Sequence, residues 1–188
     1  FRSGLTISTE FDVRQNPGQS ISERLLHKEK TIDSIFLTHL HFDHTSGLAS
    51  LDSDFNLILG KGEISNNSSL RSQTSHLNDI GIINEIDFSN AESIFPFDAV
   101  VDVFGDNSLF AISTKGHTDG HVSYLLNSID GPILVTGDQL NIQENIDLEV
   151  GPGNFSADVE MAQVYFEQIM ELKKSYPHLK LYMGHYIQ

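Results

Sequence analysis

The segment THLHFDH, residues 38–44, places three histidines and an aspartate within seven positions, directly after the apolar run TIDSIFL. This run predicts a buried strand, so the cluster is expected at the end of that strand. Residues two apart in an extended segment project to the same side, so His39 and His41 can bind one metal ion. Asp43 and His44 can then turn toward another. An isolated His-x-His is more often a surface feature, but four such side chains after a buried strand indicate a metal site.

Three further apolar segments end at a glycine that is followed by a potential ligand. They are AISTKG before His117, PILVTG before Asp138 and KLYMG before His185. Glycine permits a sharp turn and a close approach of the backbone to a metal centre. Taken alone, Asp138 would be interpreted as a turn residue and His185 as a residue at a frayed chain end. Only the repeated pattern of strand, glycine and potential ligand supports a metal-binding role for them. Imidazole nitrogen and carboxylate oxygen suit zinc, and also iron or manganese.

The other histidines carry weaker signals. His27 on a short helix, His76 in a polar segment and His178 after Pro177 are expected to be solvated. His121 has two interpretations that the sequence leaves open. It either donates a hydrogen bond behind the metal ligands or packs at the start of the VSYLL strand.

The remaining sequence predicts a mixed set of helices and strands. Ser20 and Glu23 form a capping box before a short helix that runs to about Lys30. NLIL at 56–59 predicts a second strand, and the Ser/Asn-rich stretch 64–79 predicts a surface excursion.

Two hairpins follow in the pattern of apolar runs and turns. The first joins AVVDVF to LFAIST, and the second joins VSYLLN to PILVT, which favours a largely antiparallel sheet. Near the end of the chain, Ser156 is predicted to cap a helix with an apolar stripe, which Pro177 closes. The segment 179–183 is then expected to form a last strand.

Composition narrows the classes of function. The 188 residues fit a single domain, 1–188, and the formal charge of −15 argues against a nucleic-acid partner. The absence of cysteine excludes thiolate-ligated zinc. We expect no membrane association, because no run of about 18 apolar residues exists. A cytoplasmic location is the expectation, although the chain begins with Phe1 and a targeting signal could precede it.

The motifs together resemble a known family. THLHFDH, GHTDGH at 116–121, TGD at 136–138 and GH at 184–185, in this order, look like the metallo-β-lactamase-fold hydrolases, from about residue 31 onward. The resemblance implies an α/β fold, an αββα sandwich of two mixed, largely antiparallel sheets with outer helices. It also implies a dinuclear centre at one edge of the sheets. By the family pattern, His39, His41 and His117 hold the first ion, Asp43, His44 and His185 hold the second, and Asp138 bridges both.

Departures from the family pattern narrow the resemblance to a glyoxalase II or lactonase-like branch. True zinc β-lactamases have no aspartate at the position of Asp138, and flavodiiron reductases have a glutamate at the position of His41. Acyl-homoserine lactonases carry a catalytic tyrosine where this chain has Asn141, which weakens the lactonase alternative without removing it. The family also begins with strands that end in an Asp-x-Gly turn, and no strand pair precedes residue 20. We therefore expect missing N-terminal strands and an exposed sheet edge, which makes a homodimer a further hypothesis.

The resulting functional hypothesis is a dinuclear metal-dependent hydrolase. A hydroxide bridging two divalent ions, zinc first and iron or manganese as alternatives, would attack a small-molecule ester, lactone or thioester. Asp43 and Asp138 are assigned catalytic roles as ligands, and Asp138 is also a candidate acceptor of the water's proton. His121, Gln139 and Asn141 are predicted to contact the substrate. The alternatives are a small-molecule phosphodiesterase and a non-catalytic metal-binding domain.

Overall fold

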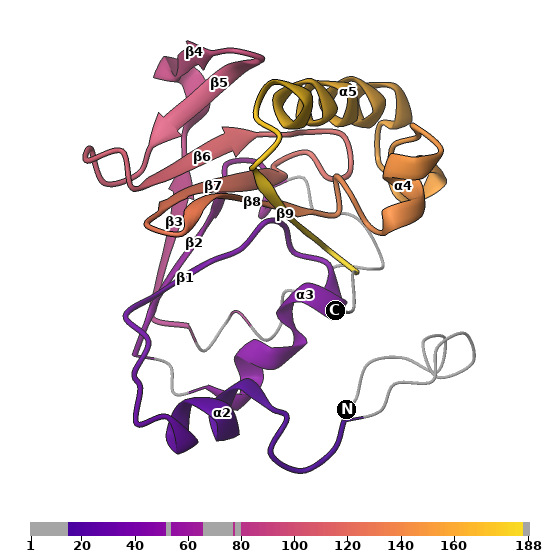
Figure 1. Cartoon of the computed structure of the whole chain (residues 1–188). Helices are drawn as coiled ribbons and strands as arrows, with labels where there is room; N and C mark the ends of the chain where they lie inside the picture. Colours follow the sequence, from indigo (N-terminus) through magenta and orange to yellow (C-terminus); the bar gives the residue numbers. More distant parts are fainter. Residues whose placement is uncertain (1–14, 52–53, 66–76, 78–79, 186–188) are drawn as a thin grey trace.

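The computed structural model describes residues 15–51, 54–65, 77 and 80–185, which form two sheets with helices on their outer faces (Figure 1). The small sheet consists of β1 (Ser34–Phe36), β2 (Asn56–Gly60) and β3 (Ile82–Ile86). The large sheet consists of β4 (Glu92–Ile94), β5 (Phe97–Asp102), β6 (Leu109–Ser113), β7 (Val122–Ser128), β8 (Gly131–Gly137) and β9 (Lys180–Met183). The helices are α2 (Ile21–His27), α3 (Phe42–Thr45), α4 (Gln143–Asp147) and α5 (Val159–Ser175), with 3₁₀ turns η1 (Ser46–Ser50), η3 (Phe88–Asn90) and η4 (Gly153–Phe155).

The large sheet is built from sequential hairpins. Strands β4 to β8 pair antiparallel in chain order, and both predicted hairpins, β5–β6 and β7–β8, are confirmed. Strand β9 pairs parallel with β8, because the chain crosses back through α5 before it re-enters the sheet. Strands β6, β8 and β9 therefore run in the same direction, and their carboxyl ends lie at one edge.

The small sheet is parallel throughout, unlike the largely antiparallel sheets that we expected. Parallel neighbours need a connection of a dozen or more residues, whereas a hairpin needs only a few. Residues 37–55 join β1 to β2, and residues 61–81 join β2 to β3. Both connections have the length that a parallel crossover requires.

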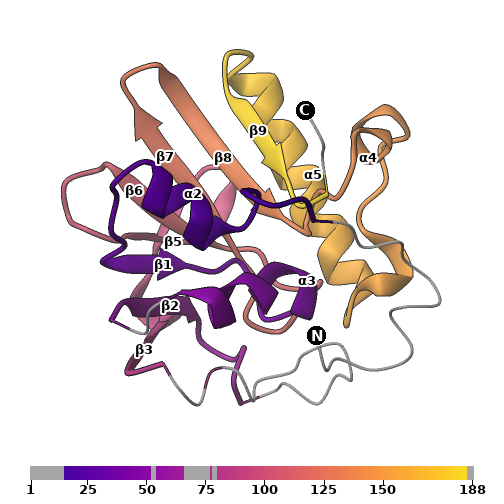
Figure 2. The ribbon, with the colours of Figure 1, turned by 90° about the horizontal axis from the view of Figure 1, so that it is seen from below.

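Successive side chains of the large sheet point to opposite faces, and each face packs in a different hydrophobic cluster. Ile112 and Leu134 face α5, where Phe166 and Ile169 are also buried. Their neighbour Ala111 belongs instead to a cluster of Ala111, Val122 and Tyr124, against which Phe36, Ile86 and other partly buried residues pack. A further cluster, which includes Leu40, Leu48, Leu57 and Leu59, packs on the small sheet. The order helix, sheet, sheet, helix in Figures 1 and 2 confirms the predicted αββα sandwich.

Several local predictions are confirmed and others are wrong. The capping box of α2 is present, but α5 is capped by Asp158, whose side chain accepts from Met161 N, and not by Ser156. Strand β1 is shorter than the apolar run suggested and is only partly buried. The short strands β3 and β4 were not predicted. The expected absence of N-terminal strands concerns residues 1–14, and most of the polar excursion is 66–76, both outside the described residues.

Over the part of the chain that the structure describes, no helix has the length and apolar character needed to cross a bilayer.

Candidate metal centre

The predicted ligands lie at the carboxyl ends of four strands. The segment with His39 and His41 follows β1, His117 follows β6, Asp138 directly follows β8 and His185 follows β9. Because β6, β8 and β9 run in one direction, their following residues meet at one sheet edge. The segment after β1 joins them through the backbone, since Val122 N donates to Thr38 O at 2.9 Å.

Four side chains form what we call the inner group: His39, His41, His117 and Asp138. All four are buried, with at most 7% of each residue exposed. His41 Nδ1 lies 3.1 Å from His39 Nε2 and 3.0 Å from His117 Nε2. Asp138 Oδ2 lies 3.9 Å from His39 Nε2 and 3.4 Å from His117 Nε2. The set could hold one metal ion, because one ligand atom from each residue lies within 4.8 Å of the others.

A second set, which we call the outer group, consists of Asp43, His44, Asp138 and His185. His44 Nε2 lies 3.0 Å from Asp138 Oδ1, and His185 Nε2 lies 3.1 Å from Asp138 Oδ2. Asp43 Oδ2 lies 3.5 Å from His185 Nε2 and 3.6 Å from His44 Nε2. The side chains of Asp43 and His185 are 37% and 44% exposed, so this group faces solvent.

Asp138 belongs to both groups, and its surroundings favour the ionised carboxylate. Burial would raise the pKa of Asp138, but hydrogen bonds with His185 and His44 and the nearby imidazoles hold it well below its usual range. The hydrogen bond with Asp138 in turn raises the pKa of His185. The carboxylate thus lies between two sets of nitrogen atoms.

The inner group has the chemistry of a metal site. Burial is the largest cause that lowers the pKa of His39 well below its usual value, so the ring is held neutral, which is the form that binds metals. Its Nδ1 lies 3.0 Å from Thr38 Oγ1, which leaves Nε2 directed at His41 and Asp138. A hydrogen bond on the outer ring nitrogen orients a ligating histidine in just this way. The donor set of imidazole and carboxylate fits zinc, iron or manganese.

Two of the three predicted substrate contacts are at odds with the structure. His121 and Gln139 are both 0% exposed, and the Gln139 amide donates to Ala162 O. His121 Nδ1 lies 2.9 Å from Thr114 Oγ1, and its ring packs 5.2 Å from that of His39. Of the two interpretations left open for His121, packing at the start of the VSYLL strand fits this burial, because His121 directly precedes β7. Asn141 is half-buried, and its carbonyl accepts from His185 N at 2.9 Å.

Sequence reasoning missed Glu63, a buried carboxylate behind the centre. It accepts hydrogen bonds from the two loops that carry His39, His41 and His117. A signal was present, because β2 is an apolar strand whose end is followed by Gly62 and then Glu63. This is the same arrangement that singled out the three later ligands.

The other histidines behave as expected where they are described. His27 and His178 are exposed, which confirms the predictions for both. His76 lies outside the described residues.

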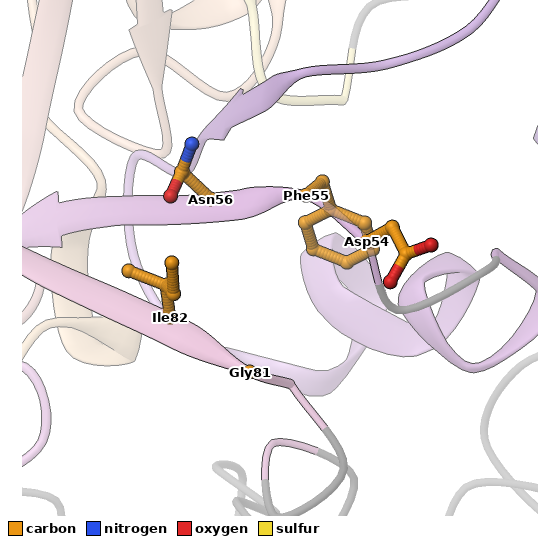
Figure 3. A pocket seen from close by; sticks show the side chains of 5 residues that line it. All are labelled: Asp54, Phe55, Asn56, Gly81 and Ile82. Atoms are coloured by element: carbon orange, nitrogen blue, oxygen red, sulfur yellow. The ribbon is translucent and has the colours of Figure 1, made fainter.

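A hollow of about 310 Å³ lies elsewhere, at the amino ends of β2 and β3 (Figure 3). Its lining consists of Asp54, Phe55, Asn56, Gly81 and Ile82. The metal-binding candidates follow the carboxyl ends of strands, and Glu63 follows the carboxyl end of β2 itself. The hollow is therefore not part of the candidate centre.

A two-sheet sandwich with His and Asp ligands at one edge defines a class of metal-dependent protein, and sequence comparison supplies the family. Residues 17–185 match the family model of the metallo-beta-lactamase superfamily, and the chain belongs to this superfamily. Gamma-lactamase MBL2 of Gibberella moniliformis is 31% identical over 150 residues, which cover 72% of this chain and 59% of that protein. A hydroxyacylglutathione hydrolase of Bartonella quintana is 28% identical over 139 residues, covering 74% of this chain and 45% of that protein. The chain thus spans only part of these relatives.

Solved structures share the fold. An N-acyl homoserine lactone hydrolase, with the product N-hexanoyl-L-homoserine bound at its catalytic metal centre, aligns with a TM-score of 0.70 at 20% identity. The alignment covers 92% of this chain and 64% of that one. A dizinc quorum-quenching lactonase aligns with a TM-score of 0.60 at 15% identity over 93% of this chain and 65% of that one. At this level of identity the likeness concerns the fold alone.

Proposed function

We propose that this chain carries a dinuclear metal-dependent hydrolase that acts on a lactone or thioester of a small molecule. One observation carries the proposal: Asp138 lies between two groups of potential ligands and contacts both. A shared carboxylate of this kind suits a pair of ions held close together. The thioester is supported by the hydroxyacylglutathione hydrolases among the relatives, and the lactone by the lactone hydrolases that share the fold.

Each of the two groups would hold one metal ion. His39, His41 and His117 would hold one ion, Asp43, His44 and His185 the other, and Asp138 would set their separation. Two divalent ions bound there would polarise the substrate carbonyl and lower the pKa of the attacking water. Asp138 would accept the proton of that water, and Asp43 would act as a ligand. No side-chain nucleophile is required.

The exposure of the outer group indicates how substrate would approach. Asp43 and His185 face solvent, whereas the inner histidines do not. Substrate would therefore enter over the outer group. Asn141, whose carbonyl accepts from the backbone of His185, would contact the substrate there.

Net charge favours a small substrate over a polymer. A formal charge of −15 opposes the approach of a large polyanion such as RNA. A small phosphodiester is the alternative substrate within the same site.

A substrate panel tests the proposal. Metal-loaded protein would be assayed with lactones, a thioester and a phosphodiester, alongside His117→Ala and the exposed-residue control His178→Ala. We expect hydrolysis of a lactone or thioester that is lost in His117→Ala and retained in His178→Ala. Hydrolysis of the phosphodiester alone would replace the proposed substrate class. Bound metal without turnover across the panel would instead support a non-catalytic metal-binding domain.

A further inference from the structure

Glu63 is a charged side chain with an unusual environment. It is 4% exposed and lies in the loop after β2, where its own backbone N–H donates to Gly60 O. Burial raises the pKa of Glu63, while hydrogen bonds from Thr118, Leu40 and Gly120 act in the opposite direction. A buried carboxylate carries a large desolvation cost, so its hydrogen-bond partners decide whether it is tolerated.

The hydrogen-bond partners of Glu63 come from two separate loops. Oε2 accepts from Leu40 N at 3.0 Å, and Oε1 accepts from Gly120 N at 3.1 Å. Oε1 also accepts from the hydroxyl of Thr118. One loop follows β1 in the small sheet and the other follows β6 in the large sheet. A single carboxylate thus connects the two sheets at the edge where the inner group lies.

Two of the three partners are adjacent to a candidate ligand. Leu40 lies between His39 and His41, and Thr118 follows His117 directly. His41 Nδ1 lies 3.1 Å from His39 Nε2 and 3.0 Å from His117 Nε2. A small shift between the loops therefore changes the distances between the nitrogen atoms that would surround an ion. The contacts of Glu63 fix the backbone that carries them.

The packing around Glu63 leaves little freedom for either loop. A Cβ on Gly120 would lie 2.6 Å from Glu63 N and 2.8 Å from Glu63 Cγ, so the second loop rests against the glutamate itself. A Cβ on Gly60 would overlap the carbonyl oxygen of Gly120. Only glycine fits this close approach of backbones.

We propose that Glu63 is a positioning residue that holds the loop of His39 and His41 at a fixed distance from the loop of His117, and thereby sets the metal affinity of the inner group. The inference rests on the proposed function only in requiring that ions bind there. Glu63 touches neither ion nor substrate, and acts through Leu40, Thr118 and Gly120.

Two variants remove its contacts to different extents. Glu63→Gln replaces one carboxylate oxygen, an acceptor, by an amide NH₂, a donor. Whether the NH₂ faces Leu40 N or faces Thr118 and Gly120, at least one hydrogen bond is lost. Thr118→Val keeps the shape of the side chain and removes only the hydroxyl contact. Glu171→Gln, on the exposed face of α5, is the matched control.

The test measures zinc affinity by competition with a chelating dye, the visible spectrum of the cobalt-loaded protein, and thermal unfolding of the metal-free protein. Loss of an outer hydrogen-bond partner typically weakens metal binding roughly 10–100-fold. We expect a loss of this size for the first ion in Glu63→Gln, a smaller loss in Thr118→Val and none in Glu171→Gln. The cobalt spectrum should change in the first two variants, because the inner ligands shift.

A purely structural role would lower the unfolding temperature without changing the affinity or the cobalt spectrum of folded protein, and that result would overturn the inference. If Glu63→Gln does not fold, Thr118→Val decides, and unchanged affinity there has the same meaning. Wild-type protein that binds no ion would overturn the proposed function as well. Loaded wild-type protein with an unaffected Glu63→Gln variant would overturn this inference alone.

Discussion

The inner and outer groups share Asp138 but differ in what holds their other members in place. The inner histidines are buried on loops that Glu63 and the contact of Val122 N with Thr38 O tie together. The outer group contains Asp43 and His44 from the four-residue helix α3, together with the exposed His185. Ligands that are fixed before binding lose less conformational entropy when they bind. We therefore expect the inner group to bind the first ion and the outer group to bind a weaker second one.

The largest effect is expected at the residue that the two groups share. Asp138→Ala removes a ligand from both, so it should abolish stable binding of the second ion and weaken the first. The loss of charge stabilisation should lower hydrolysis roughly a thousandfold or more. Metal content after dialysis and turnover of the best lactone or thioester measure both effects. The control is Asp130→Ala, at an exposed position in a hairpin turn. If the two variants behave alike, Asp138 is not part of the metal centre.

The next comparison separates the groups by changing one histidine in each. His117→Ala should weaken the first ion by roughly 100-fold or more, whereas His185→Ala should leave the first ion nearly unchanged and remove the second. Cobalt titrations of the two variants, with His178→Ala as control, report both steps. Equal losses from His117→Ala and His185→Ala would show that the groups do not differ.

A glycine next to the outer group gives a steric test. A Cβ on Gly184 would overlap Asp138 Oδ1 and lie 3.0 Å from Gly137 O, whereas a Cβ on Gly81 meets nothing within 4 Å. Gly184→Ala should displace the shared carboxylate, weaken the second ion roughly tenfold and cost about 1–3 kcal/mol of unfolding free energy. Denaturant titration and metal titration measure these changes. Gly81→Ala should change neither, and a similar loss there would contradict the steric explanation.

The smallest effect is expected at an exposed carboxylate near the loop of Glu63. Lys61 Nζ lies 2.7 Å from Asp87 Oδ2, and this contact, together with hydrogen bonds from Ser89, lowers the pKa of Asp87 from 3.8 to about 2. A carboxyl whose pKa is lowered on folding adds stability above its unfolded pKa and loses it as the pH falls toward the folded pKa. The small difference in stability between wild type and Asp87→Asn should thus vanish as the pH falls from about 4 to about 2.

Denaturant titrations at several pH values and salt concentrations measure this difference. It should also shrink in salt, because the pair is exposed. Metal affinity should stay unchanged in Asp87→Asn. A large loss of affinity would contradict the view that Asp87 has no part in the centre.

The candidate ligands could be identified from sequence because each stands in a short-range pattern. A strand, a glycine and a potential ligand follow one another within a few residues for His117, Asp138 and His185. The hairpins, which also have short-range signals, set the directions of β6 and β8, and the crossover through α5 makes β9 run the same way. The histidines and the aspartate of residues 38–44 can be recognised as potential ligands from their spacing in the sequence alone.

The parts that were missed depend on contacts far apart in the sequence. Glu63 meets Leu40 across 23 residues and Thr118 across 55, so no local pattern marks its partners. Strands β3 and β4 are short and largely exposed or half-buried, so they show no clear apolar alternation. Ser156 was predicted as the cap of α5, but the helix begins two residues later and Asp158 caps it, which depends on the path of the backbone.

The most direct test of the central claim is an equilibrium titration of cobalt into the metal-free chain, followed by calorimetry and visible absorption. The account predicts two ions per chain in two steps, with the first bound at least roughly tenfold more tightly than the second. Folded protein that binds no ion, or only one, would contradict the two-ion centre around Asp138.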